Sequence, residues 1–564
     1  MGKASLKSAS TKRPRGAWAW AIALFALAFG IRYVGIRWSL PNETHYYSYH
    51  PDEWLVLLAS YFVMNPYAGD WLPGFYNYGT LPMTLWSAWL HWLSAFGVIA
   101  PLPENPTPLQ LAQLRADLLL WARVLTALLG AGTAVVVART LALVAGERAG
   151  LFAGLAIALA PAFVVHSRFQ TVDVPTTFFV ALAFYQSVAL WNAPNRWRTL
   201  LWGAFWAGCA AGSKYNAGLA ILALWVSWGL LTRRDAGGWY GMLGGILASA
   251  GVALLTFLLV CPGSWADREK FWRDFRYEVR HVKQGHGEIF TDTGLGWVYH
   301  LYPNLTTGFT LTGLVLGLMG WLWAGRRERA LWGIALASLA YYLLIGSAEV
   351  RFMRYTFPLF PTLAIGLGLW VSEAAGKLQR AGRWLIPVVL MVQAVYTTDY
   401  TLCMVRPDAR DQAVEWIREN ISERSVIAFP TVPWFYTPPL FPETGELFWE
   451  ERLKAMQASE GRYQLVSLAP PEWSAENLRL HQPDYVLISE FEARDVARIG
   501  RPDYRAFMQA LQQDYVLLET FSNGPALVGN RNSLPHDMLY ICPEVMLWGR
   551  KTVVEDELNT GGAP

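Results

Sequence analysis

Apolar runs that approach the thickness of a bilayer recur through the first 400 residues of this 564-residue chain. A segment that crosses a lipid core must satisfy its backbone hydrogen bonds internally, and a helix of about 20 apolar residues does so. Hydrophobic residues make up 54% of the chain and charged residues 16%, and the mean hydropathy is +0.23. These features predict a polytopic α-helical membrane protein.

The first apolar run, Ala17–Trp38, is expected to be a retained membrane anchor. A basic leader precedes it, and the positive-inside rule therefore places the N-terminus in the cytoplasm and the next loop outside. Leu81–Ile99 is also apolar, but His91 interrupts it and prolines flank it. We therefore expect an interfacial or re-entrant segment there, within an outer loop that covers residues 39–122.

Ten further spans are expected after this loop. They are Arg123–Val144, Leu151–Val165, Val174–Trp191, Leu200–Gly212, Ala217–Leu231, Gly241–Val260, Thr310–Trp323, Leu331–Ile345, Thr356–Val371 and Trp384–Thr397. In this register every short basic loop faces the cytoplasm, whereas a full span at Leu81–Ile99 would turn all of them outward. The sequence thus predicts about eleven spans in a multi-pass protein of the inner (plasma) membrane.

The amino-acid composition and periodicity of the chain change at about Thr401. Charged residues become frequent, and helix-like stretches alternate with short strand-like ones. The helix-like stretches are Asp408–Asn420 and Pro502–Gln513, and the strand-like ones are Ser425–Ala428, Tyr485–Ile488 and Tyr515–Leu518. This pattern predicts a membrane domain at 1–400 and a small extracytoplasmic α/β domain at 401–564. Outside the cytoplasm, Cys403 and Cys542 could form a disulfide or remain two free thiols.

The stretch from Tyr49 to Trp54 carries the strongest functional signal. It places Asp52 and Glu53 side by side just after the first span, with His50 next to them. No Lys or Arg occurs between Arg37 and Arg115 to neutralise the two carboxylates. We interpret this acidic pair as the centre of an active site at the outer membrane surface; the competing interpretation is a solvated loop start.

Three more outer turns carry polar residues. They are His166–Pro175, which includes Arg168 and Asp173, then Lys214–Asn216, and Val350–Tyr355, which includes Arg351 and Arg354. Charges near a bilayer are costly, so a one-sided cluster of this kind is a functional hypothesis by default. Each residue also has a structural alternative: Asp173 could cap a helix, and the cations could reach toward lipid headgroups. Cys261–Phe309 could be a lid or a solvated connector.

The candidate groups fit transfer of a group from a lipid phosphate to a hydroxyl. Fixed cations bind phosphate, and Arg168, Lys214, Arg351 and Arg354 supply them. A first-loop carboxylate could take the hydroxyl proton as the new bond forms. The cations would stabilise the charge that develops on the leaving phosphate, and the lipid tail would lie along the helices.

These motifs together resemble the GT-C glycosyltransferases. The resemblance rests on His50-Pro51-Asp52-Glu53, on Tyr76 to Pro82, on the turn from Arg168 to Pro175, on Gly212 to Tyr215 and on Arg351 to Pro361. It covers about residues 15–400 and is greatest to the ArnT-like and protein O-mannosyltransferase-like enzymes, which use polyprenyl-phosphate sugars. No inserted β-trefoil domain is recognisable here, which weakens a protein-acceptor interpretation.

The resemblance implies Asp52 or Glu53 as general base, Asp173 as a second acidic group, and Lys214, Arg351 and Arg354 near the phosphate. The expected substrate-binding set is His50, Tyr78, His166, Arg168, Lys214, Tyr215, Arg351, Arg354 and Tyr355. No cofactor is expected, although His50, His166, Asp52 and Glu53 could form a metal site. The expected partners are a polyprenyl-phosphate-linked sugar, an acceptor that is a lipid, glycan or protein, and the bilayer.

The net charge is only +3, so a nucleic-acid partner is not expected. A lipid or glycan transporter or flippase is the main alternative. Transporters place coupling charges near the bilayer midplane and often show repeated halves. Here the charges collect at one face and no internal repeat is visible. A third function class, a sensor or assembly scaffold that uses the outer domain, would not require converging acids and cations beneath that domain.

Overall fold

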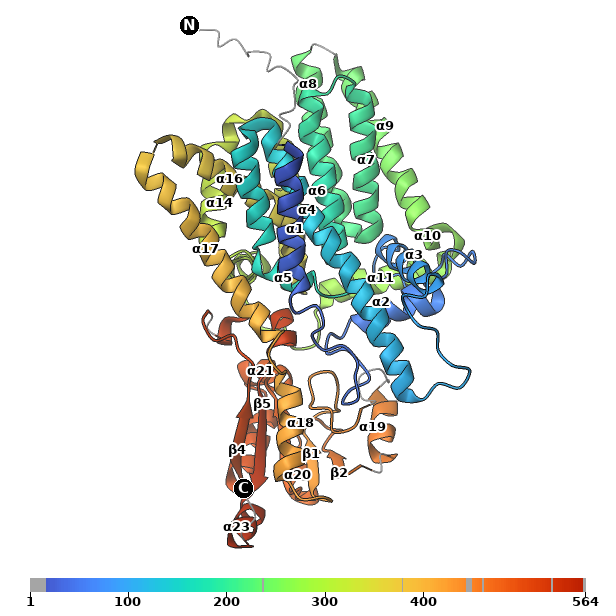
Figure 1. Cartoon of the computed structure of the whole chain (residues 1–564), viewed down its shortest axis with the longest axis vertical. Helices are drawn as coiled ribbons and strands as arrows, with labels where there is room; N and C mark the ends of the chain where they lie inside the picture. The colour runs from blue at the N-terminus through green and yellow to red at the C-terminus, as the bar shows by residue number, and fades with distance from the viewer. Residues whose placement is uncertain are drawn as a thin grey trace.

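The computed structural model describes residues 17–235, 238–377, 379–442, 449–458, 461–528 and 531–560. It divides into a bundle of long helices and a smaller part built around a β-sheet (Figure 1). The first helix, α1 (Ala17–Tyr33), begins at the end of the bundle that lies away from the sheet. The long helix α17 (Gln379–Cys403) connects the two parts and extends past residue 400.

Helices occupy the segments that the sequence marks as apolar spans. After α1 they are α4 (Pro108–Ala158), α5 (Pro161–His166), α6 (Asp173–Ala189), α7 (Arg196–Ser213), α8 (Ile221–Arg234), α9 (Gly238–Val260), α14 (Leu311–Trp323), α15 (Trp332–Gly346), α16 (Phe360–Lys377) and α17. Within the described residues, six helices are long and apolar enough to cross a membrane, or seven if one bent pair counts as a single span. The count of eleven stays a prediction.

The helix α4 covers two of the predicted spans. Its N-terminus is fixed by a capping box, in which the Thr107 side chain accepts from the Gln110 backbone and the Gln110 side chain accepts from Thr107. The helix breaks at Gly146, whose φ of +85° is readily adopted only by glycine. This break falls in the short loop that the sequence predicts between the two spans.

Small residues allow two helix pairs of the bundle to pack with their backbones in contact. A Cβ on Gly320 of α14 would lie 1.8 Å from the carbonyl oxygen of Gly366 in α16. A Cβ on Gly333 of α15 would lie 2.3 Å from the carbonyl oxygen of Ala223 in α8. Close approach through small residues is a common way for helices to associate in lipid. It fixes α14 on α16 and α15 on α8.

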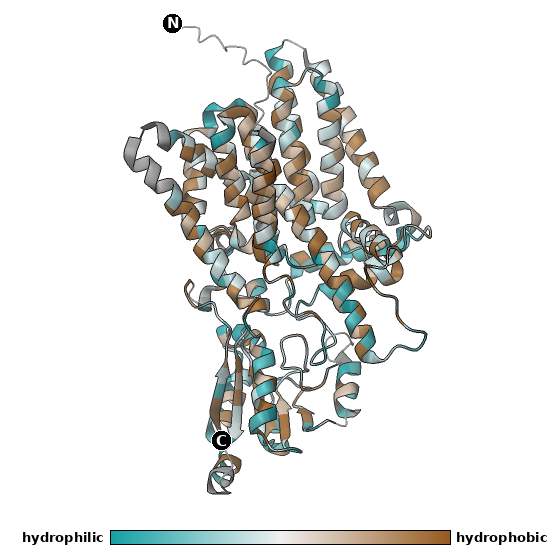
Figure 2. Ribbon diagram, in the orientation of Figure 1, coloured by the Kyte–Doolittle hydropathy of each residue, from teal (hydrophilic) through white to brown (hydrophobic). Residues whose placement is uncertain are grey.

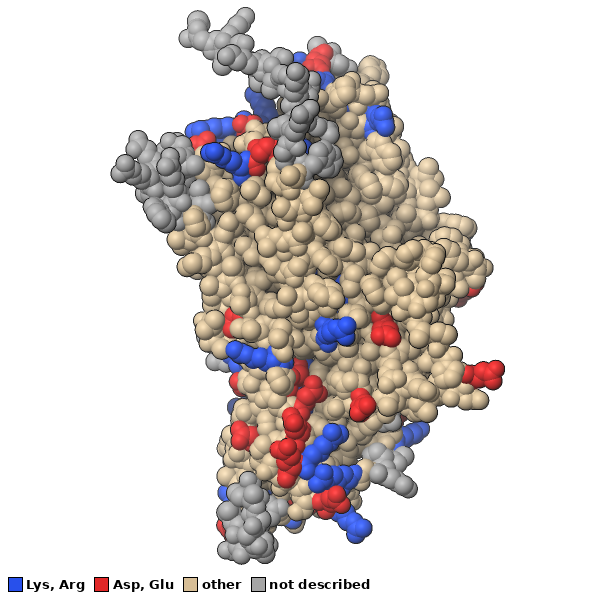
Figure 3. Space-filling model, in the orientation of Figure 1, with Lys and Arg blue, Asp and Glu red and all other residues tan. Residues whose placement is uncertain are grey.

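The surface of the helical part is apolar. Hydrophobic residues dominate its helices (Figure 2), and on the face shown in Figure 3 charged residues are scarce across its middle and gather at its ends. Large apolar side chains such as Leu254 and Leu259 of α9 and Leu339 of α15 are exposed. Such a belt would be unfavourable in water and is typical of a lipid-facing surface. The structure is that of a polytopic helical membrane protein.

Two irregular segments lie at the end of the bundle that faces the sheet. The first follows α1 and contains α2 (Glu53–Leu57), a π-helical turn η1 (Leu58–Val63) and α3 (Leu81–Ala95). The second follows α9 and consists of several short helices. They are α10 (Gly263–Ala266), α11 (Arg268–Gln284), α12 (Gly296–Tyr299), η4 (His300–Leu305) and α13 (Thr306–Gly308).

The C-terminal part contains a five-stranded sheet in the order β2-β1-β3-β5-β4. The strand β1 (Val426–Phe429) lies between β2 (Gln464–Ser467) and the central β3 (Tyr485–Ser489) and runs parallel to both. The strand β5 (Val545–Arg550) is antiparallel to β3 and to β4 (Tyr515–Phe521). The three predicted strand-like stretches are therefore confirmed as β1, β3 and β4.

Helices cover both faces of this sheet. Since alternate strand residues point to opposite sides, neighbouring residues pack in different cores. Ile427 packs in a core with α18 (Ala409–Asn420) and α19 (Trp449–Ala458), whereas its neighbour Ala428 packs in another. The second core involves α20 (Ala475–His481), α21 (Glu490–Arg498) and α22 (Pro502–Asp514). The last helix is α23 (Lys551–Thr560). Cys403 and Cys542 are buried free thiols in hydrogen-bonding contact.

Candidate active site

Asp52 forms an ion pair with Arg354 where the helical part meets the C-terminal part. Arg354 belongs to η7 (Met353–Leu359), a turn of 3-10 helix that leads into α16. Its Nη2 lies 3.1 Å from Oδ2 of Asp52. Asp52 occupies the N-cap position of α2 but makes no side-chain cap bond, so its carboxylate is free to face Arg354. The Asp52 side chain is 27% exposed, whereas that of Arg354 is 6% exposed.

A second ion pair continues from the first. Nζ of Lys214, which follows α7, lies 2.7 Å from Oδ1 of Asp173 at the start of α6. The other Asp173 oxygen lies 3.9 Å from Nε of Arg354. The Lys214 ammonium also lies 4.0 Å from the ring centre of Tyr355. Four segments far apart in the sequence thus bring Asp52, Arg354, Asp173 and Lys214 into one continuous network.

The ionisation of Asp52 is controlled by this network. Burial alone would raise its pKa, but the Arg354 guanidinium together with His50, His286 and Lys214 outweighs burial, and the pKa of Asp52 is lowered. The carboxylate is therefore ionised at neutral pH and is able to accept a proton. Glu278 of α11 also lies within electrostatic range of Lys214 and Arg354, and burial raises its pKa. No motif in the sequence pointed to Glu278.

Glu53 points away from this network and is completely buried. Its Oε1 accepts from Nε of Arg123 at 2.8 Å and from the backbone N–H of Gln170 at 2.8 Å. Its Oε2 accepts from Nη2 of Arg123 at 2.6 Å and from the Ser48 hydroxyl at 2.6 Å. The expectation that the acidic pair lacks a basic partner is wrong, because Arg123 and Arg354 each neutralise one carboxylate.

Arg168 and Arg351 do not join the central network, and their donors are occupied elsewhere. Arg168 is fully buried and donates to the carbonyl oxygens of Ile31 and Arg32 and to the Thr401 hydroxyl. Arg351 donates to Thr293 and to carbonyl oxygens of adjacent turns. Arg351 precedes the helical turn that begins at Met353. The two arginines 351 and 354 therefore do not share a helical face, and the expected pair of phosphate ligands is not formed here.

The candidates His50, Tyr78 and Tyr215 are wholly or partly buried next to the network. His50 is buried, and its Nδ1 accepts weakly from the Asp52 backbone at 3.3 Å; burial lowers its pKa to about 4. The Tyr215 hydroxyl donates to the carbonyl oxygens of Tyr76 and Tyr78, which fixes that loop. Tyr78 is partly buried, and burial raises its pKa.

His166 is fully buried against Phe169 and Phe357. Neither of its ring nitrogens has a hydrogen-bond partner among the residues that the structure describes. The described part of the chain also contains no group of three His, Cys, Asp or Glu side chains that could hold a metal ion. The four-residue metal set that includes His50 and His166 does not come together in this conformation.

A segment of the C-terminal part completes the site. It is η9 (His536–Ile541), which the sequence analysis did not single out. Buried Asp537 accepts from the backbone N–H groups of Met353 at 3.2 Å and Arg354 at 3.0 Å. The Tyr540 hydroxyl lies 3.5 Å from Nη1 of Arg354. Asp537 thus holds the turn that carries Arg354, from a position about 180 residues later in the chain.

Asp52 and Arg354 face a cavity of about 600 Å³. Its other walls come from the turn at 286–289, from residues 431–436 and from α21 and η9 of the C-terminal part. A volume of this size is typical of small-molecule sites, which range over about 300–1,000 Å³. The carboxylate therefore has open space on one side and fixed cations on the other, an arrangement suited to deprotonating a hydroxyl next to an anionic leaving group.

The comparison with protein families finds one similar family. Residues 111–262 match the family model of the dolichyl-phosphate-mannose-protein mannosyltransferases. The expected resemblance to the GT-C glycosyltransferases is confirmed. Asp173 and Lys214 of the network lie inside the matched region. No curated protein sequence matches the chain significantly.

Solved structures of similar proteins come from three kinds of enzyme. ArnT from Cupriavidus metallidurans, bound to undecaprenyl phosphate, has 16% identity and a TM-score of 0.46, with 95% of this chain and 99% of that chain covered. The oligosaccharyltransferase AglB from Archaeoglobus fulgidus has 12% identity and a TM-score of 0.47, covering 94% and 77%. The S. cerevisiae Pmt1-Pmt2 complex bound to its sugar donor has 20% identity and a TM-score of 0.29, covering 48% and 35%.

Proposed function

We propose that this protein is an integral-membrane glycosyltransferase that moves a sugar from a polyprenyl-phosphate donor to an acceptor hydroxyl. The observation that carries the proposal is the network of Asp52, Arg354, Asp173 and Lys214, which joins an accessible carboxylate to two fixed cations. Asp52 is the general base in this proposal. Glu53 has a structural role, because all four hydrogen bonds to its oxygens are already made inside the protein.

The reaction is a single displacement at the anomeric carbon of the sugar. The acceptor oxygen forms the new bond while its proton passes to the Asp52 carboxylate. The bond between the anomeric carbon and the phosphate oxygen breaks, and its electron pair leaves on the polyprenyl phosphate. Arg354 and Lys214 stabilise the charge that develops on this phosphate. One displacement of this kind inverts the anomeric configuration. The chain's own cations supply this stabilisation, so the proposal assigns no step to a metal.

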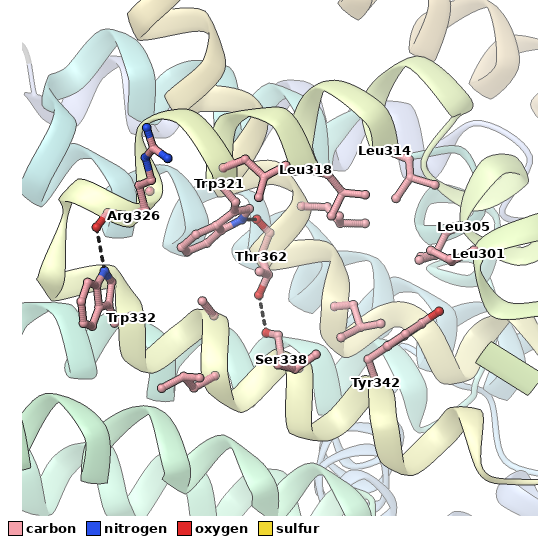
Figure 4. Close-up of a pocket in the computed structure, with 17 residues that line it drawn as sticks. Leu301, Leu305, Leu314, Leu318, Trp321, Arg326, Trp332, Ser338, Tyr342 and Thr362 are labelled. Atoms are coloured by element: carbon pink, nitrogen blue, oxygen red, sulfur yellow. Dashed lines mark hydrogen bonds between the residues drawn. The ribbon is translucent and has the colours of Figure 1, made fainter. Parts of the chain in front are cut away.

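A groove in the helical part fits the lipid tail of the donor (Figure 4). It has a volume of about 680 Å³ and lies between α14, α15 and the α16 region, lined mainly by leucine and tryptophan side chains. Its polar groups are satisfied within the protein: Ser338 and Thr362 are hydrogen bonded to each other, and Trp321 donates to the Thr362 carbonyl. Leu359 at this groove belongs to the same turn as Arg354. An isoprenoid chain could therefore lie here with its phosphate near the cations.

We propose that the reaction occurs at the extracytoplasmic face of the inner membrane. The N-terminal end of α1 and the C-terminal part lie at opposite ends of the bundle (Figure 1). The basic leader before α1 favours a cytoplasmic N-terminus. The network and the C-terminal part would then both lie outside the cytoplasm, where polyprenyl-linked sugars are presented on the outer leaflet.

The proposal is tested with the purified full chain in proteoliposomes. A panel of polyprenyl-phosphate hexoses and pentoses is supplied with mixed lipid, glycan and peptide acceptors, and released polyprenyl phosphate is measured. Asp52→Asn should lower turnover by at least about 100-fold, the usual contribution of a general base. Asp70→Asn is the matched control, because Asp70 is an exposed aspartate of the same loop. A folded Asp52→Asn protein with normal turnover would refute the base assignment. Lipid flipping without donor turnover would refute the enzyme assignment.

A further inference from the structure

The cavity in front of Asp52 has an outer wall that belongs entirely to the C-terminal part. The helical part contributes Pro51, Asp52, Phe352, Arg354 and the turn at 286–289 to the cavity, whereas the opposite wall includes Trp434, Tyr436 and residues of α21 and η9. Lys214 and the apolar groove lie outside the lining of this cavity. A donor held by the cations would therefore leave the cavity open on the side of the base, which is where an acceptor hydroxyl must arrive.

The side chains of this outer wall are of the types that bind sugar rings. The wall combines aromatic rings with planar charged groups, represented by Trp434, Phe491, Arg452 and Glu472. The C–H faces of a sugar pack on aromatic rings, while carboxylates and guanidinium groups hydrogen bond to adjacent hydroxyls. Trp434 is 37% exposed, and the Arg452 guanidinium lies 4.8 Å from its ring centre. The two side chains thus offer a stacked platform at the cavity surface.

Two buried polar atoms on this wall lack partners within the described residues. They are Nδ1 of His536 and Nε of Arg452, and their side chains belong to residues that are 7% and 9% exposed. Buried polar groups without partners are costly, and both of these side chains belong to residues that line the cavity. Nε2 of His536 faces Asp495 Oδ2 at 3.6 Å, which favours the proton on that nitrogen. Nδ1 then carries the free lone pair of the ring, which can accept a hydrogen bond.

The balance of charge favours a neutral ligand over an anionic one. Glu472, Glu492 and Asp495 line the outer wall. The described lining as a whole carries five carboxylates, the other two being those of Asp52 and Glu288, against the arginines 354, 452 and 501. Arg501 is paired, with Nη1 lying 3.0 Å from Glu288 Oε2 and a further pair to Asp503. A phosphorylated acceptor would face several carboxylates. The described lining contains no strand residue, so an extended peptide could not pair with a sheet edge here.

We infer that this cavity is the acceptor site and that it binds a neutral saccharide, with one sugar hydroxyl directed at Asp52. This inference rests on the proposed function and names the acceptor class for the same site. It assigns the C-terminal part the role of selecting the acceptor, while the helical part holds the donor.

The inference is tested by equilibrium binding to the full chain in detergent, without donor turnover. The probes are a neutral mannotriose, the same trisaccharide carrying a phosphate, and a threonine-containing peptide, each followed by saturation-transfer NMR. A second measurement follows binding of undecaprenyl phosphate. Trp434→Ala should weaken mannotriose binding by about tenfold, since stacking on an aromatic ring is lost. His536→Phe should also weaken it, while both variants keep wild-type binding of undecaprenyl phosphate.

Trp71→Ala is the matched control, because Trp71 is an exposed tryptophan outside the cavity lining. Tighter binding of the phosphorylated sugar or of the peptide than of mannotriose would overturn the inference. Equal mannotriose binding by wild type and Trp434→Ala would overturn it as well. Mannotriose binding that depends on Trp434, in a protein that turns over no polyprenyl-phosphate sugar, would uphold the saccharide site and refute the glycosyltransferase proposal.

Discussion

Glu53 and Asp52 are adjacent in sequence but should respond to substitution in different ways. Glu53→Gln removes the charge opposite Arg123, and both side chains of this pair are fully buried. Breaking a buried ion pair on one side typically costs about 3–5 kcal/mol, because the remaining charge is left without compensation. The glutamine would also direct an NH2 group at donors of Arg123, Ser48 or Gln170. At about 1.4 kcal/mol per tenfold, the ratio of unfolded to folded protein should therefore rise by about 10² to 5 × 10³-fold.

The loss is measured by reversible unfolding of the purified protein in mixed micelles, with helical CD as the signal. Glu53→Gln should lose about 3–5 kcal/mol of unfolding free energy, whereas Asp52→Asn, at a partly exposed site, should lose much less. In a double-mutant cycle with Arg123→Met, the two losses should be strongly non-additive, because the second change removes the unpaired charge. Glu53→Gln that keeps wild-type stability but loses all transfer would refute this reasoning and restore Glu53 as a candidate base.

The pH dependence of stability follows from the same pair. Burial would raise the pKa of Glu53, but the charge and hydrogen bonds of Arg123, together with His50 and the Ser48 hydroxyl, outweigh burial and lower the pKa below the unfolded value of about 4.3. A lowered folded pKa means that this stabilisation is fully present above the unfolded pKa and is lost as the pH falls through the folded pKa. Wild type should therefore lose stability below about pH 4.3, and the loss should be smaller in Glu53→Gln. An equal acid-induced loss in both proteins would contradict this.

Three further predictions concern the donor side. Lys214→Met should weaken undecaprenyl phosphate binding by at least about tenfold through loss of a phosphate-binding cation, with exposed Lys454→Met unchanged in the same binding assay. Asp537→Asn weakens the hydrogen bonds that position the turn carrying Arg354, so kcat should fall by about tenfold or more with a smaller change in acceptor KM. Asp537→Glu should restore part of the lost kcat. Equal kcat in wild type and Asp537→Asn would contradict the positioning role. Leu339→Trp fills the apolar groove and should weaken long-chain polyprenyl phosphates more than short-chain analogues, whereas Leu343→Trp, on the same helix outside the groove lining, should discriminate little between them.

Much of the architecture could be predicted from hydrophobic patterning. The runs that the sequence marks as spans are helical, and the strand-like stretches after residue 401 form β1, β3 and β4. The convergence of Asp52, Asp173, Lys214 and Arg354 also follows from sidedness, because four turns at one end of a bundle must lie near one another. Periodicity and sidedness therefore locate a site to within one face of the molecule.

The direction of individual side chains could not be predicted in the same way. Asp52 and Glu53 are neighbours, yet one faces a cavity and the other a buried arginine 70 residues later. Arg168 lies in a turn with the right sidedness, but its guanidinium turns inward to carbonyl oxygens. Asp537 belongs to a part of the chain that the sequence presents as a separate domain. These choices depend on tertiary contacts between distant segments, which no local pattern records.

The close backbone contacts at Gly320 and Gly333 determine how lipid binding in the apolar groove would affect the ion-pair network of Arg354 and Lys214. They join α14 to α16 and α15 to α8, so the apolar groove is a seam between two preassembled pairs of helices. Arg354 precedes α16 directly in the chain, and Lys214 precedes α8 in the same way. In the proposed function, a lipid chain bound in this seam would therefore change the spacing between Arg354 and Lys214. The length of the lipid tail would then affect how Arg354 and Lys214 hold the phosphate.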